Sequence, residues 1–599
     1  MMSVVPVQLC LAGKEVTDVR VRPGGQWVSG VVSEPGLHGA VSRLCMWSVA
    51  HHDVVVDLLV DPLPMAGRGL SGGVHCWDLE GRRVFITTAK EGIVEVALVD
   101  DVPARQHSLA FDPTRNWSTP AIDYTQSSVY AIADWCEMWK CTLDGGEAQL
   151  VYRTDGFAID ATAGADGMCV TWNRPHMPWT QSTIYPEPAI TEVSMQQPRF
   201  STHGNSFGFI NDVSGVANVH ISADRVVAHD VMIDDECEHG GSTWGPGQRT
   251  WCFNSDGTKV AYTRNEKGFG ALWVYDRFTT QRTKVDKGIF GCVSWENDTL
   301  AALRTGARTP TQVVAYDMSP QKFGERTVVV QPGAEHWLTP EIEEELVEPS
   351  LHEAANGDVV VPYRLYRAKK PNWGVIVWVH GGPVDQWQVT FRPKFSYWLS
   401  RGWSIVVVDH RGTTGHGRSF QQQLEGHWGI HDAEDTVAVV RQVQRAFGFR
   451  SERTVLMGSS AGGLSVLNAL GTSRTLAAGA VVSFPVVDLV DLMQGADPFE
   501  THYMPRLIGA RDMEDPLLRE RSPLSRAHVI AGTPLLVFHG DNDTLVPLSH
   551  SEQLRDVVNA AGGAVRLEVM HGEGHGFRDP LHIIREYSMT EEFLDELMG

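Results

Sequence analysis

The pattern of hydrophobic and polar positions changes near the middle of the chain. From about residue 20 to 335, apolar and polar residues alternate in short stretches rich in β-branched side chains, separated by Gly, Asp, Asn and Pro. A period of two is typical of half-buried β-strands, and no long segment here follows a helical period. The pattern therefore predicts an all-β N-terminal half.

Pairs of these predicted strands recur at intervals of roughly 40 to 50 residues, the spacing of repeated sheets. The clearest pair joins residues 259–263 to 271–276, and weaker echoes occur near Trp77, Trp139 and Trp295. Such repeats fit the blades of a β-propeller, in which each four-stranded sheet buries its faces against neighbouring blades. We predict a propeller of seven or eight blades. A pair of large β-sandwiches is the competing architecture.

Continuous apolar runs replace the alternation after the acidic stretch 341–348. They cover residues 374–380, 404–409, 454–457, 478–483 and 534–539. Runs of this kind are typical of strands buried on both faces of a parallel sheet. Residues 435–447 and 549–560 carry apolar side chains at helical spacing. We predict a β-propeller domain at 1–345 and an α/β-hydrolase domain with a doubly wound, mostly parallel sheet at 346–599.

Charge and cysteine usage narrow the function classes. The 599 residues contain 50 Lys and Arg against 73 Asp and Glu, a formal charge of −23. A surface this acidic repels phosphate backbones and anionic lipids, so we expect no nucleic-acid or membrane partner. No apolar run has the length that a bilayer needs, and the first residues lack a signal-peptide pattern, which predicts a cytoplasmic protein. All nine cysteines lie between Cys10 and Cys292, without a CxxC pair, which favours reduced thiols.

The candidate nucleophile follows the apolar run 454–457. Residues 458–462 read Gly-Ser-Ser-Ala-Gly, a G-x-S-x-G motif centred on Ser460. At a strand-to-helix turn this motif forms a nucleophile elbow, whose glycines allow the chain to project the serine hydroxyl above the sheet. The Ala461 amide is then one donor to an oxyanion. The glycines of residues 380–383, which follow an earlier strand, offer the second donor.

An acid and a base follow in the order expected of an α/β-hydrolase. Asp541 and Asp543 both follow the run 534–539, and either carboxylate could orient an imidazole. His575 follows the last predicted strand, and its flanking glycines suit a tight turn that projects its ring, which favours it over His571. No HExxH, EF-hand, Walker A or GxGxxG pattern occurs, so we expect no metal and no cofactor.

This order of parts resembles the prolyl oligopeptidase family of serine peptidases, and is most similar to its acylaminoacyl-peptidase and dipeptidyl-aminopeptidase-like branch. The resemblance is carried by residues 380–383, 409–417, 426–429, 458–463, 539–543 and 574–577. It implies a propeller that caps an α/β-hydrolase. It also implies that Ser460 is the nucleophile, His575 the base, and Asp543, rather than Asp541, the acid. The amides of Ala461 and Gly382 are the implied oxyanion hole.

The resemblance also places a specificity pocket beside the nucleophile. In this chain the corresponding apolar residues are Val486, Val487, Leu489 and Leu492. Packing against the sheet edge explains them equally well. Two residues after Asp543, where many family members carry a polar side chain that can hold a substrate carbonyl, this chain has Leu545, which cannot donate a hydrogen bond.

The leading hypothesis is a serine exopeptidase or oligopeptidase that cleaves amide bonds of short peptides through an acyl-enzyme. An esterase or amidase that removes an acyl or aminoacyl group from a small metabolite is the alternative. An inactive propeller scaffold is a third, against which the intact Ser460, Asp543 and His575 argue. Homo-oligomerisation is left open.

Overall fold

The computed structural model describes residues 5–599 except 12, 37–38, 111, 113, 187–191, 203, 205, 223–229, 335, 373 and 496–499. Contacts between Cα atoms divide the chain into two units. One unit, the propeller unit, comprises residues 13–335 and 388–391. The other, the hydrolase unit, comprises residues 1–12, 336–387 and 392–599.

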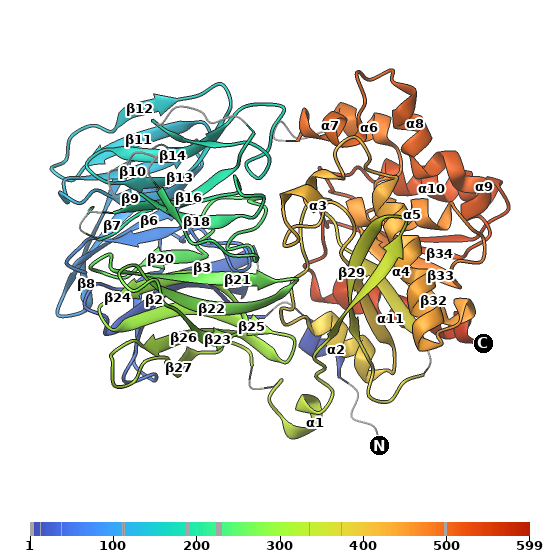
Figure 1. Cartoon of the computed structure of the whole chain (residues 1–599), viewed down its shortest axis with the longest axis horizontal. Helices are drawn as coiled ribbons and strands as arrows, with labels where there is room; N and C mark the ends of the chain where they lie inside the picture. Colours follow the sequence, from blue (N-terminus) through green and yellow to red (C-terminus); the bar gives the residue numbers. More distant parts are fainter. Residues whose placement is uncertain are drawn as a thin grey trace. The chain divides into compact units, whose positions relative to one another are not determined.

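The propeller unit consists of seven antiparallel sheets in chain order, coloured blue to green in Figure 1. Six sheets have four strands and one has three within the described residues. They are β1–β4 (Glu15–Val21, Trp27–Gly36, Gly39–Ser48, Val55–Leu59), β5–β8 (His75–Trp77, Arg83–Thr88, Gly92–Val99, Val102–Ala110), β9–β12 (Trp117–Ile122, Ser128–Ala133, Glu137–Thr142, Gln149–Arg153), β13–β15 (Phe157–Ala163, Gly167–Trp172, Thr183–Tyr185), β16–β19 (Met195–Phe200, Phe207–Asn211, Asn218–Ser222, Asp230–Met232), β20–β23 (Trp251–Phe253, Lys259–Glu266, Phe269–Asp276, Arg282–Lys287) and β24–β27 (Ile289–Glu296, Thr299–Gly306, Thr309–Asp317, Glu325–Val330). The predicted propeller is confirmed, with seven blades.

Apolar side chains bury the faces of these blades against one another. The first strands of neighbouring sheets contact each other, as β1 does with β24 and β13 does with β9 and β16. One core cluster joins β1 and β2 to the last sheet, so that the first and last blades close the ring through side chains such as Val19 and Leu303. Strands such as β10 and β13 are accordingly buried at every position, so these blades are covered on both faces and not only on one, as the alternation had predicted.

The hydrolase unit is built on one eight-stranded sheet in the order β28-β29-β31-β30-β32-β33-β34-β35. Its strands are β28 (Ser350–Asn356), β29 (Val359–Tyr366), β30 (Val375–Val379), β31 (Ser404–Val408), β32 (Thr454–Ser459), β33 (Gly479–Ser483), β34 (Leu535–Gly540) and β35 (Val565–Met570). The strands from β31 to β35 in this order pair in parallel, whereas β28 and β29 are antiparallel additions at one edge. This confirms the predicted α/β-hydrolase class.

Helices cover both faces of this sheet. They are α1 (Pro340–Glu343), α2 (Pro393–Ser400), α3 (Arg418–Gln422), α4 (His431–Phe447), α5 (Ala461–Leu470), α6 (Leu489–Gly495), α7 (Tyr503–Ile508), α8 (Pro516–Arg521), α9 (Ala527–Ile530), α10 (Ser549–Ala560) and α11 (Pro580–Met598), with short 3-10 turns at Val7–Cys10, Ser451–Arg453 and Pro523–Arg526. No helix of the described residues is long and apolar enough to cross a membrane.

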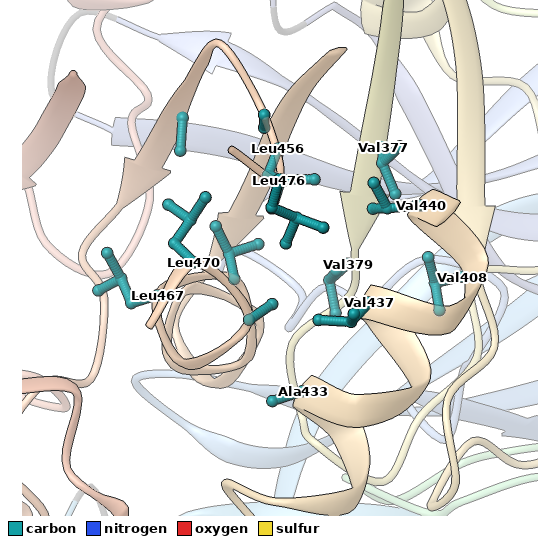
Figure 2. Packing of buried hydrophobic residues seen from close by; sticks show 14 of the residues in the cluster. Val377, Val379, Val408, Ala433, Val437, Val440, Leu456, Leu467, Leu470 and Leu476 are labelled. Carbon is teal, nitrogen blue, oxygen red and sulfur yellow. The ribbon is translucent and has the colours of Figure 1, made fainter. Parts of the chain in front are cut away.

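Side chains that alternate along the central strands explain why both faces are covered. Val377 and Val379 of β30 pack with Val437 of α4 and Leu467 of α5 in the main core, which Figure 2 shows. Trp378, between the two valines, points to the opposite face, where its ring lies 5.4 Å from that of Phe395 on α2. A continuous apolar run therefore produces a strand with two buried faces.

Candidate active site

Ser460 lies between β32 and α5 in a strained backbone conformation. Its φ of 55° and ψ of −125° fall in a region that residues with a side chain rarely adopt. The Ser460 amide donates a hydrogen bond of 3.1 Å to the Ser483 carbonyl at the end of the next strand, which anchors the turn to the sheet. The arrangement is that of a nucleophile elbow, in which strain at one residue exposes its hydroxyl.

Two glycines allow the elbow to form because they lie against backbone atoms. A Cβ atom on Gly462 would lie 2.5 Å from the Val379 carbonyl oxygen of β30. A Cβ atom on Gly458 would overlap the carbonyl oxygen of Gly462. Any side chain at either position would separate α5 from the strands beside it. The G-x-S-x-G spacing therefore has a steric cause in this fold.

Asp543 and His575 form a buried carboxylate–imidazole pair at the carboxyl ends of β34 and β35. Asp543 Oδ2 lies 2.7 Å from His575 Nδ1, and Asp543 Oδ1 accepts hydrogen bonds of 2.9 Å from the amides of Leu545 and Val546. Burial raises the pKa of Asp543, but the bonds from His575 and the two amides outweigh burial and lower the pKa below its usual value. The ionised carboxylate can only accept, so Nδ1 of His575 carries the proton and Nε2 remains available as a base.

The nucleophile and the imidazole are linked through the end of β33. The sheet order β32-β33-β34-β35 brings the carboxyl ends of these strands to one edge. Phe484, the residue after Ser483, has its ring centroid 4.4 Å from that of His575. Within the described part of the chain the Ser460 hydroxyl makes no hydrogen bond. Contacts between nucleophile and base are often long in proteins without substrate and shorten when the substrate binds.

The candidate oxyanion donors come from the start of α5 and from the segment that follows β30. Ala461 is the first residue of α5, so its amide has no acceptor within the helix and lies at the positive end of the helix dipole. The segment that contains Gly382 is adjacent, since a Cβ atom on Gly381 would lie 3.7 Å from Cβ of Ser460. Gly382 itself has a φ of 122°, which favours glycine.

A buried network holds the segment that contains Gly382. The His380 imidazole lies 2.8 Å from both the Gly381 carbonyl and the Thr413 hydroxyl. Burial, together with the neighbouring His410 ring, lowers the pKa of His380 to about 3, so His380 is a neutral structural group. Gln386 donates to Asp409 at 3.2 Å. The motif at residues 409–417 therefore contributes to the site by supporting this segment.

The structure separates the competing acid and base from the buried pair. Asp541 Oδ2 lies 2.9 Å from His571 Nδ1, and the two side chains form a second pair at the surface, where His571 is 82% exposed. By contrast, the side chain of Asp543 is fully buried and that of His575 is 21% exposed. Sequence spacing alone could not assign the two acids to the two histidines.

Glu573 is a residue of this site that sequence reasoning missed. Its carboxylate is buried and accepts hydrogen bonds from the amides of Arg578 and Asp579, at 2.9 and 2.7 Å. The same oxygen lies 3.1 Å from Nδ1 of His582. These bonds fix both ends of the loop that carries His575. The only signal in the sequence is an acidic residue inside a glycine-rich loop, which ordinarily indicates a solvated turn.

The four residues predicted to form a specificity pocket are all buried. The amide of Val486 lies 3.4 Å from the Ser460 carbonyl oxygen, so Val486 is adjacent to the nucleophile. Val487 belongs to the main core, and its amide donates to His550 at 3.1 Å. The Leu489 amide donates to Ser522. Leu545, 47% exposed, lies two residues after the acid.

No cluster of three or more potential metal ligands occurs among the residues that the structure describes. All nine cysteines are free.

The fold and this site define a class of protein, an α/β-hydrolase with a serine elbow beside a carboxylate–imidazole pair. Residues 389–599 match the model of the prolyl oligopeptidase family. The matched segment, about a third of the chain, contains Ser460, Asp543 and His575.

Curated relatives match about a third of the chain. Dipeptidyl peptidase family member 6 of Caenorhabditis elegans is 32% identical over 234 residues, which cover 38% of this chain and 31% of that protein. Dipeptidyl aminopeptidase BIII of Pseudoxanthomonas mexicana is 30% identical over 234 residues, 38% of this chain and 33% of that protein. The acylamino-acid-releasing enzyme of Mus musculus is 26% identical over 204 residues, 32% of this chain and 27% of that protein. The matches therefore span about a third of the length of these relatives.

Solved structures resemble the whole chain in fold. A Mycobacterium tuberculosis puromycin-hydrolyzing peptidase has a TM-score of 0.84 at 20% identity, with 100% of this chain and 97% of that chain covered. The acylaminoacyl peptidase of Pyrococcus horikoshii has a TM-score of 0.71 at 16% identity, with 97% of this chain and 95% of that chain covered. At these identities the likeness concerns the fold.

Proposed function

We propose that this protein is a serine hydrolase that cleaves amide bonds of short peptides through an acyl-enzyme intermediate. The observation that carries the proposal is the buried Asp543–His575 pair, 2.7 Å between Oδ2 and Nδ1, at the same sheet edge as the strained Ser460 elbow. The family match of residues 389–599 supports it.

The residues supply each step of acyl transfer. His575 Nε2 takes the proton of the Ser460 hydroxyl as Oγ attacks the substrate carbonyl carbon, and the amides of Ala461 and Gly382 stabilise the resulting oxyanion. The protonated imidazole then gives its proton to the leaving amine, and the C–N bond breaks. A water molecule, deprotonated by His575, hydrolyses the acyl-enzyme and regenerates Ser460. Asp543 holds the imidazole in the required tautomer and stabilises its cation.

Covalent labelling tests the nucleophile. A fluorophosphonate probe should label the wild-type protein stoichiometrically and should not label Ser460→Ala. His575→Ala should react far more slowly, whereas His571→Ala, which removes the exposed imidazole, should react like the wild type. An unlabelled wild-type protein of intact fold would sink the proposal and favour the scaffold hypothesis.

The substrate class is a further part of the proposal. The relatives named above include a dipeptidyl peptidase and acylamino-acid-releasing enzymes, whose names refer to different peptide N-termini. We therefore propose profiling short peptides with free and with acylated N-termini, together with matched esters. Cleavage of peptides at rates comparable to the esters is expected for a peptidase.

The esterase or amidase alternative is favoured by one observation. Leu545, 47% exposed beside the acid, offers an apolar side chain that cannot donate to a peptide carbonyl. Turnover of esters and small amides with no peptide cleavage would select this alternative. Cytoplasmic location stays a prediction, which cell fractionation would test, and light scattering would determine the oligomeric state.

A further inference from the structure

Three arginines cluster inside the propeller unit: Arg20, Arg199 and Arg249. Arg20 on β1 and Arg199 on β16 both follow a bulge at which one residue, Asp18 or Gln197, has a positive φ. Arg249 precedes β20. Each arginine therefore comes from the first strand of a different blade or from the loop that enters it.

Short contacts connect the three guanidinium groups. Arg20 Nε and Arg249 Nη2 lie 3.8 and 3.6 Å from the same oxygen, Asp18 Oδ1. Arg199 Nη2 donates a hydrogen bond of 2.7 Å to the carbonyl of Gln248, the residue next to Arg249. Arg20 and Arg249 therefore share the Asp18 carboxylate, and Arg199 is anchored to the residue next to Arg249.

The backbone engages Asp18 and one oxygen of Asp160, the two carboxylates around the cluster. Asp18 accepts hydrogen bonds of 2.8 Å from the amides of Val74 and His75 and from the His75 ring. Asp160, the second acid, accepts a bond of 2.6 Å at Oδ1 from the Gly247 amide, whereas its buried Oδ2 has no partner among the described residues. Burial lowers the pKa of His75, so that ring is neutral. Three guanidiniums against two carboxylates leave an excess of one positive charge.

The arginines also keep hydrogen-bond donors that have no acceptor. A guanidinium has five N–H donors. The Arg20 side chain makes no hydrogen bond to any residue that the structure describes, and the buried Nε atoms of all three arginines are without an acceptor. The pKa values of Arg20 and Arg199 are lowered to about 10, mainly by burial and secondly by the charge of Arg249. Both side chains therefore remain cationic at neutral pH. Buried donors in native proteins are nearly always satisfied, by protein, water or an ion.

We propose that Arg20, Arg199 and Arg249 bind a small oxoanion inside the propeller. Phosphate or carboxylate oxygens are the acceptors that guanidinium groups match in geometry and charge. An anion would supply the missing acceptors and neutralise the excess charge. Arg20 keeps 23% of its side-chain surface accessible, so a small ion can reach it. The site is independent of the proposed hydrolase activity.

The acidity of the chain makes such a site selective. With a formal charge of −23, the surface repels anions in general. An anion that binds must therefore gain its affinity from donors gathered at one place. We therefore do not expect weak binding of anions elsewhere on the surface to compete with binding at the three arginines.

Calorimetric titration with sodium phosphate at pH 7, against sodium chloride of equal ionic strength, tests the proposal. The wild-type protein should bind phosphate saturably, with a parallel rise in its melting temperature. Arg20→Met and Arg199→Met should weaken the affinity at least tenfold. Arg68→Met, which removes an exposed arginine of the same unit, is the matched control and should bind like the wild type.

Acetate competition separates the two sources of oxoanion. Displacement of phosphate by millimolar acetate would identify a carboxylate site, and its failure a site for phosphate. If Arg20→Met does not fold, Arg20→Lys, which keeps the charge but has fewer donors, takes its place. Absence of saturable binding of both phosphate and acetate to the wild type would overturn the proposal. So would unchanged affinity in the folded arginine variants.

Discussion

At the scale of single residues, two carboxylate–imidazole pairs lie in the same pair of loops and differ in what surrounds them. Asp543 is buried, is held by two amides and faces the His575 imidazole through Oδ2, with the buried His539 ring 3.7 Å from the same oxygen. Asp541 and His571 are exposed, and water competes for the same bonds. Interactions between exposed groups are weak because water screens them. Only the buried pair can therefore fix a tautomer.

Exchanging the acids for amides should separate the two pairs. In Asp543→Asn the ionic acceptor is replaced by a neutral amide, which cannot hold His575 in the tautomer with a protonated Nδ1. We expect kcat to fall by about 10⁴-fold. Asp541→Asn, the matched control, should change kcat less than about threefold, as is usual for an exposed pair. Steady-state kinetics on the best substrate of the peptide and ester profile measures both. Equal losses in the two variants would contradict the role given to Asp543.

Glu573 is expected to position the base without touching the substrate. Glu573→Ala removes the acceptor of two loop amides, so the loop should loosen and kcat should fall by about 10- to 100-fold, as misplaced catalytic groups do. Glu573→Gln keeps a carbonyl oxygen for these amides and should recover most of the rate. A purely structural role would lower the melting temperature in both variants and leave kcat of the folded fraction unchanged.

Glu296, at the end of β24, predicts a pH dependence of stability. Burial raises its pKa to about 7, although the hydrogen bond from Ser255 acts in the opposite direction. The raised pKa means that the folded state favours the neutral acid. The stabilisation that the neutral carboxyl group gives the folded state is therefore complete below the pKa of a glutamate in the unfolded chain, near 4.3. It is lost as the pH rises through about 7.

Glu296→Gln mimics the neutral acid at every pH. We expect the variant to be more stable than the wild type at pH 8, by up to about 3 kcal/mol for the cited shift, and equally stable at pH 4.5. Urea unfolding at the two pH values measures the difference. A constant difference between the variant and the wild type would show that Glu296 does not titrate in this range.

At the scale of elements, the elbow depends on contact between backbones. Gly462→Ala places a methyl group against the Val379 carbonyl, so α5 must move away from β30. We expect a loss of at least about 2 kcal/mol in the free energy of unfolding, typical of overpacking. Gly495→Ala, at the end of α6 with no atom within 4 Å of the new Cβ, should stay within about 1 kcal/mol of the wild type. Urea unfolding compares them, and similar values would contradict the steric account.

The elements of the hydrolase unit could be predicted better than those of the propeller unit. Runs of apolar residues fixed the parallel strands to within about two residues because strands buried on both faces leave no polar positions. Helix α4 begins at His431 rather than 435, since its first turn carries Asp432 and Glu434, which suit a helix N-terminus but break the apolar period. The blade number could not be predicted, because the repeat is degenerate and turn residues vary between blades.

At the scale of the whole chain, two features escaped sequence reasoning for a common reason. The short segment at residues 5–11 groups with the hydrolase unit, although nearly 400 residues separate it from its partners. Residues 388–391 in turn group with the propeller unit. A periodic pattern reports only local structure, so contacts of this range leave no signal in it. The same limit applies to Glu573, whose role comes from a loop closed by tertiary contacts.

Deleting the first eleven residues should therefore weaken the hydrolase unit. Val5 is fully buried there, its amide donates to the Ser400 hydroxyl at 3.1 Å, and Arg401 donates to its carbonyl at 3.0 Å. Loss of this burial and these bonds should cost about 3 kcal/mol. Hydrogen exchange should show reduced protection in α2 and α11, because Ser400 and Arg401 lie at the end of α2 and Glu591 of α11 bonds to Arg401.

Val5→Asp should reproduce the effect and Gln8→Ala, which changes an exposed side chain, should not. Protection lost only in the propeller strands would contradict the assignment of this segment.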